Sequence, residues 1–204
     1  MVSSTQIRQT ARDSLRNNWL QAVAVTLIYC LIFIVIGFIP FLGEIVTFVI
    51  AGPLILGFYV YHLKLIRGEN PDVSLLFSGF NQFLQTFVLY LLTSIFIFLW
   101  TLLLIIPGII ASLRYSMAYF IMNDNPGMTA VEAIQASKTM MEGHKADLFV
   151  LSLSFIGWIL LAVLTLGIGF LWLIPYMATS IAAFYQNIKD DSYFSPNYSD
   201  GVPM

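Results

Sequence analysis

The fold is decided by residues 73–113, VSLLFSGFNQFLQTFVLYLLTSIFIFLWTLLLIIPGIIASL, which contain no charged side chain. Residues 148–188 form a second uncharged stretch, and only Glu44 interrupts a third over residues 17–63. A helix needs about 20 apolar residues to cross a bilayer, so each stretch is long enough for roughly two crossings. Only 10% of the chain is charged and 59% is apolar, whereas about a quarter of the residues in a soluble domain are charged. These stretches predict an all-α, polytopic membrane helical bundle.

The basic residues predict how the bundle is oriented. Arg114 is the only one that interrupts an apolar stretch, and the others are Arg8, Arg12, Arg16, Lys64, Arg67, Lys138, Lys145 and Lys189. No Lys or Arg occurs in the connections at 37–43, 105–108 and 165–169. Because cytoplasmic loops collect Lys and Arg, we expect six spans, paired as three hairpins, with both termini in the cytoplasm. The predicted spans cover residues 19–36, 44–66, 83–104, 107–122, 146–165 and 168–188.

An amphipathic helix is predicted within residues 1–18, ahead of the membrane domain at 19–188. Ser3 and Gln6 have the spacing of a capping box at its start. Ile7, Ala11, Leu15 and Trp19 recur every fourth residue, with Arg8, Arg12 and Arg16 in a stripe beside them. This pattern is typical of a helix in the cytoplasmic interface, with its apolar face toward lipid and its arginines near anionic head groups. Such a helix senses lipid or simply anchors the topology.

Two further surface segments are predicted, one after Asn70–Pro71 and one after Asn125–Pro126. The second runs over 129–142 and begins with Thr129 and Glu132, another capping-box pair. It offers Val131, Ile134, Met140 and Met141, which either dock a membrane or cytoplasmic protein partner or lie on the bundle itself. Residues 189–204 are polar and are predicted to be a disordered cytoplasmic tail.

Each hairpin has a proline in its second span: Pro53, Pro107 and Pro175. A proline removes a backbone donor and clashes with the preceding turn, so Pro53 is expected to kink its span. Pro107 is expected in the first turn of its span, where proline is tolerated. Broken helices surround the cavities of transporters, yet proline is also frequent in ordinary membrane bundles. The prolines therefore leave open whether the bundle has a central cavity.

Arg114 is the sharpest candidate for a functional residue, because a charge within a span marks a functional site by default. It is a candidate to bind an anionic group, with Ser112, Tyr115 and Ser116 beside it. The alternative is a structural arginine whose long stem reaches toward the cytoplasmic interface. Glu44 either complements the dipole at the start of its helix or pairs with Arg114.

The chain has no signature of an enzyme or a metal site. It lacks a GxSxG motif, a Walker loop and a cluster of Cys and His ligands, and a net charge of −2 gives no reason to expect nucleic-acid binding. We expect no metal and no cofactor. The residues favour a non-catalytic scaffold, regulator or lipid-interacting accessory whose partners include membrane lipids. The alternative is a small carrier or lipid translocator that binds an anionic group through Arg114.

Several short sequence motifs in the chain resemble those of one protein family. They are Gly52–Pro53–Leu54–x–Leu56–Gly57, Arg67–Gly68–Glu69, the segments 106–117 and 132–145, and Leu153–Ser154–Phe155–Ile156–Gly157–Trp158. With these the chain resembles the bacterial integral-membrane family called domain of unknown function 975. That family is distantly similar to the membrane domain of some glycerophosphodiester phosphodiesterases. The resemblance implies a multi-pass protein of the bacterial plasma membrane with no assigned activity.

Overall fold

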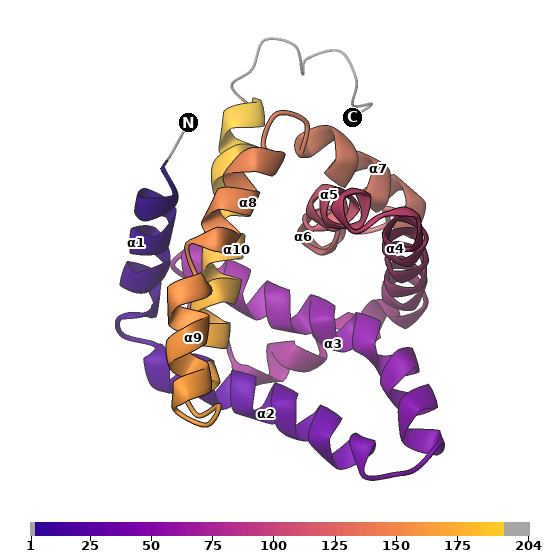
Figure 1. Ribbon diagram of the computed structural model, residues 1–204, viewed down its shortest axis with the longest axis horizontal. Coiled ribbons are helices and arrows are strands. Elements are labelled where there is room, and N and C mark those ends of the chain that lie inside the picture. The colour runs from indigo at the N-terminus through magenta and orange to yellow at the C-terminus, as the bar shows by residue number, and fades with distance from the viewer. Residues whose placement is uncertain (1–2, 194–204) are drawn as a thin grey trace.

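The structure is a computed structural model that describes residues 3–193, and all of its regular elements are helices. In Figure 1, α1 and α8 to α10 gather on one side, α4 to α7 on the other, and α2 and α3 run beneath both. The elements are α1 (Ser4–Leu15), α2 (Trp19–Gly37), α3 (Leu42–Ile66), the 3₁₀ helix η1 (Val73–Gln82), α4 (Phe83–Leu103), α5 (Ile105–Tyr115), α6 (Ala118–Asp124), α7 (Ala130–Met140), α8 (Lys145–Leu153), α9 (Ile156–Leu164) and α10 (Phe170–Tyr193).

Five helical segments among residues 3–193 are long and apolar enough to cross a membrane. By helix length and composition the chain is therefore a multi-pass membrane protein. The segments are Trp19–Gly37, Leu42–Ile66, Val73–Leu103, Ile105–Asp124 and Lys145–Leu164.

The sixth predicted span, residues 168–188, is not among these five, and all but its first two residues lie in α10. The middle of α10 buries small and polar side chains, among them Ala178, Thr179 and Ser180, which is typical of a helix packed between other helices. The predicted count of six spans is therefore not confirmed. The helix also continues to Tyr193, so the predicted tail 189–204 begins as helix, and residues 194–204 lie outside the described part.

Two of the apolar segments are broken rather than continuous. The fourth divides between α5 and α6, and the fifth between α8 and α9. At the first break Ser137 of α7 replaces the helical hydrogen bonds. Its Oγ donates to the carbonyl oxygen of Arg114 at 2.7 Å and accepts from the N–H of Met117 at 3.2 Å. Backbone groups inside a membrane protein need such partners, because no water is there to supply them.

The three prolines occupy two kinds of position. Pro107 is the third residue of α5, so it lies in the first turn as predicted. Pro53 and Pro175 lie inside α3 and α10, and each of these remains one helix in the structure.

The middle of α3 packs against η1 through backbone contacts at glycines. A Cβ added at Gly57 would collide with the carbonyl of Leu76, and one added at Gly79 would collide with the carbonyl of Pro53. The segment after Asn70–Pro71 is therefore not a separate surface helix. It continues into α4 and lies against α3, with Leu76 fully buried.

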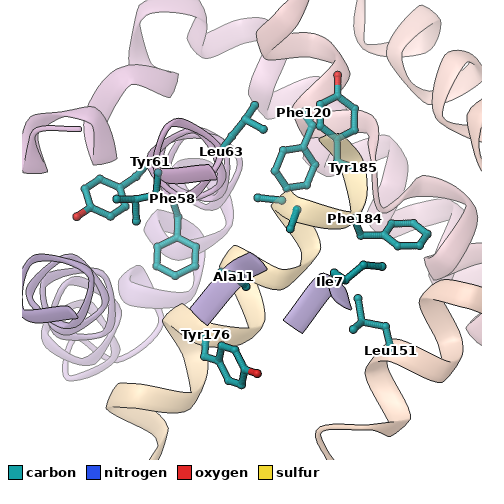
Figure 2. Close-up of a cluster of buried hydrophobic side chains, with 14 of the residues drawn as sticks. Ile7, Ala11, Phe58, Tyr61, Leu63, Phe120, Leu151, Tyr176, Phe184 and Tyr185 are labelled. Atoms are coloured by element: carbon teal, nitrogen blue, oxygen red, sulfur yellow. The ribbon is translucent and has the colours of Figure 1, made fainter. Parts of the chain in front are cut away.

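The apolar face of α1 is covered by protein, not lipid. Ile7, Ala11 and Leu15 are all buried, and Figure 2 shows the first two beside Tyr176 and Phe184 of α10. The predicted capping box of Ser3 and Gln6 is present. The prediction that the apolar face of this helix contacts the bilayer is wrong, because α10 supplies an apolar surface that the face covers.

The helix predicted at 129–142 forms α7, and its capping box of Thr129 and Glu132 is also present. Ile134 is buried in the bundle, whereas Val131 remains 63% exposed. The surface left for a protein partner is therefore smaller than the sequence pattern indicates.

A glycine pair tests the close packing of α3 and η1. Gly79→Ala should lower the midpoint of thermal unfolding in detergent, because the new methyl group meets backbone atoms that cannot rotate away. Overpacking of this kind costs about 1–3 kcal/mol. Gly157→Ala in α9 is the matched control, since nothing lies within 4 Å of its added Cβ. Equal midpoints for the two variants would contradict the packing.

Candidate functional site

Arg114 lies in the last turn of α5. Its Nε atom is buried and has no hydrogen-bond partner among the described residues. The hydroxyls of Ser112 and Ser116 donate to carbonyl groups of their own segment at 2.7 and 2.8 Å. Tyr115 is buried, with Lys138 Nζ 5.7 Å from its ring centroid. The structure therefore does not gather the three predicted neighbours around the guanidinium.

Glu44, His62 and His144 make local contacts of their own. Glu44 lies in the first turn of α3, where a negative charge complements the helix dipole. In the part of the chain that the structure describes, no ion pair joins it to Arg114. His62 is buried with Nδ1 2.8 Å from the carbonyl oxygen of Phe58, and His144 lies 3.6 Å from Asp147.

A polar cluster that the sequence reasoning missed centres on Asp124, the last residue of α6. Arg67, which follows α3, donates from Nη1 at 3.0 Å and from Nη2 at 2.6 Å to the two carboxylate oxygens. Lys189 and Tyr185 of α10 donate to the same carboxylate at 2.7 and 2.9 Å. The side chain of Asp124 is only 7% exposed. One carboxylate therefore joins an end of each of α3, α6 and α10.

Arg67 uses all sides of its guanidinium in this cluster, toward Asp124 and toward Gln186. The hydrogen bonds from Arg67 to Asp124 raise the pKa of the guanidinium, and they outweigh burial, which acts in the opposite direction. Its Nε also donates to Oε1 of Gln186 at 3.1 Å. No local pattern indicates the cluster, because Asp124 is separated from Arg67 and Lys189 by 57 and 65 residues.

A groove lined mainly by apolar side chains lies between α1, the start of α2, α9 and α10. Its volume is about 460 Å³. Three tryptophans line it, Trp19 from α2, Trp158 from α9 and Trp172 from α10. We call it the tryptophan groove. The remaining lining residues are Arg12, Leu161, Ala162, Thr165, Gly169, Leu173 and Tyr176.

Arg12 gives the tryptophan groove a cationic edge. Its Cζ lies 5.9 Å from the ring centroid of Tyr176, a distance at which a cation is attracted to an aromatic face. Tyr176 in turn donates to the carbonyl oxygen of Arg8 at 3.4 Å and packs near Trp19, with ring centroids 6.5 Å apart. Among the side chains that the structure describes, residues 3–189, no ion pair includes Arg12. The groove thus combines apolar walls with one cation that has no acidic partner there.

The Asp124 cluster predicts that the carboxylates of Asp124 and Glu69 contribute differently to the stability of the protein. Asp124→Asn should destabilise the protein by about 1.5–3 kcal/mol, the usual contribution of hydrogen bonds to charged groups. Glu69→Gln is the control, because Glu69 pairs with Lys64 at the surface at 2.9 Å and such pairs contribute about 0–1 kcal/mol. Thermal unfolding in detergent, followed by circular dichroism, measures both. A midpoint for Asp124→Asn as high as that of Glu69→Gln would contradict the role of the cluster.

Comparison with known proteins confirms the resemblance found in the sequence. No curated protein and no solved structure matches the chain. The matched family is described as protein of unknown function (DUF975), and its matches cover residues 1–107 and 101–192, nearly all of the chain. The chain therefore belongs to the DUF975 family.

Proposed function

We propose that this protein is a non-catalytic membrane protein that binds anionic lipids at the cytoplasmic face of the bacterial plasma membrane, as a scaffold or regulatory accessory. The observation that carries the proposal is the row formed by Arg8 and Arg12 on α1 and by Arg16 at its C-terminal cap. Arg12 lines the tryptophan groove, and no ion pair of the described side chains includes any of the three.

The packing of α1 supports this function. Arg8, Arg12 and Arg16 are spaced four residues apart, so they share one side of the helix. The neighbouring face, with Ile7 and Ala11, is buried in the bundle, which fixes the row in place. A basic residue near an anionic membrane surface contributes about 1 kcal/mol of attraction. The row therefore supplies up to about 3 kcal/mol of preference for anionic over neutral lipids.

The sequence pattern supports the cytoplasmic assignment, because Lys and Arg are absent from the connections at 37–43, 105–108 and 165–169. The absence of a catalytic motif in the sequence supports a binding role rather than chemistry on the lipid. Exposed apolar side chains on α2, α4 and α9, such as Leu20, Phe98 and Leu160, suit contact with acyl chains.

The carrier alternative has less support. Its one favourable observation is the buried Nε of Arg114, which has no partner within the described residues. Arg114 does not line the tryptophan groove, and the hydroxyls of Ser112 and Ser116 bond to their own backbone. The arginine row on α1 therefore fits an anionic ligand better than Arg114 does.

A charge-matched pair of variants tests the proposal. Wild-type protein in neutral detergent should be stabilised more by added phosphatidylglycerol than by phosphatidylcholine, by about 2–3 kcal/mol at lipid concentrations near 100 times Kd. Replacing Arg8, Arg12 and Arg16 together with Gln should remove most of this difference. The control replaces Lys64, Lys138 and Lys145 with Gln, which removes the same charge elsewhere.

Thermal unfolding midpoints with each lipid give the result. The proposal fails if wild-type protein responds equally to both lipids, or if the arginine and lysine triple variants lose the preference to the same extent.

A further inference from the structure

We infer that the tryptophan groove is a specific site for one anionic phospholipid, with the phosphate at Arg12 and an acyl chain between α9 and α10. The inference rests on the proposed function and names the place where a single lipid is retained.

The walls of the groove suit an acyl chain. Leu161 and Ala162 of α9 and Leu173 of α10 contribute aliphatic surface, and the three tryptophans contribute aromatic surface. A volume of about 460 Å³ falls within the roughly 300–1,000 Å³ that is usual for ligand sites. Gly169 packs closely against Ala162, and both residues line the groove.

The charge of the groove favours an anionic head group. Arg12 is the one lining residue with a charge, and a guanidinium forms paired, charge-assisted hydrogen bonds with phosphate oxygens. Tyr176 holds the guanidinium over its ring, while its hydroxyl donates to Arg8.

The experiment compares two arginines one turn apart. Native mass spectrometry of protein in neutral detergent, titrated with phosphatidylglycerol, should show one lipid bound per chain. Arg12→Gln should weaken this binding by about tenfold or more, as expected from losing a charge-assisted hydrogen bond. Arg16→Gln should weaken it by no more than about twofold, because Arg16 carries the same charge and is exposed away from the groove.

A second variant tests the acyl-chain part of the site without changing charge. Leu161 lines the groove and is 55% exposed. Leu161→Phe replaces it with a larger, aromatic side chain that occupies part of the groove. It should reduce lipid retention while the unfolding midpoint of the lipid-free protein stays unchanged. Glycerol 3-phosphate, which has the phosphate without the chain, should not compete with the lipid.

Several outcomes would overturn the inference. Equal losses in Arg12→Gln and Arg16→Gln would leave the anionic-lipid preference of α1 intact but remove the specific site. Competition by glycerol 3-phosphate would make the groove a site for a free anion. A dimer that is lost in Leu161→Phe would make the groove a contact between copies of the chain.

Discussion

The hydrogen bonds to the carboxylate of Asp124 are the interaction on which the arrangement of α3, α6 and α10 depends. It accepts hydrogen bonds from Arg67 at the end of α3 and from Lys189 and Tyr185 on α10. A buried carboxylate without partners is strongly unfavourable, so folding must bring these three segments to one place. Where they meet, Tyr185 and Lys189 of α10 lie against the end of α6, and α10 also packs against α1 and α9.

The tryptophan groove lies where α10 meets α1 and α9. The apolar face of α1 covers α10 through Ile7 and Ala11, while the arginine row remains at the edge of this contact. Small residues, Ala162 and Gly169, join α9 to α10 closely at one end. The larger rings of Trp158 and Trp172 then line a space that neither helix fills. The same contact that holds α1 on the bundle therefore places a cation at the mouth of an apolar groove.

The sequence predicts the local features of this fold well and its long-range contacts poorly. The apolar runs predict α2 and α4 to within a residue at each end, and both capping boxes follow from spacing alone. These features depend on residues that are close in the chain. The Asp124 cluster depends on residues 57 and 65 positions apart, so no periodicity reveals it.

The sequence predicts part of the candidate site, and the part that it misses depends on contacts between helices. The arginines of α1 stand out because they are evenly spaced, but the direction of the helix's apolar face depends on what α10 presents to it. Arg114 stands out because a charge within an apolar run is rare. Its backbone carbonyl, however, is what another helix contacts, through Ser137, and hydropathy carries no information about a carbonyl group.

The break between α5 and α6 also depends on a segment that is translated later. Ser137 lies 20 residues after Met117 and 23 after Arg114, so the broken segment leaves the ribosome before its partner exists. At about 5–20 residues per second, this gap amounts to roughly 1–4 seconds of translation. During that interval the unpaired carbonyl and amide disfavour full release of the segment into lipid. Maturation of this part of the membrane domain is therefore tied to synthesis of the polar segment that follows it.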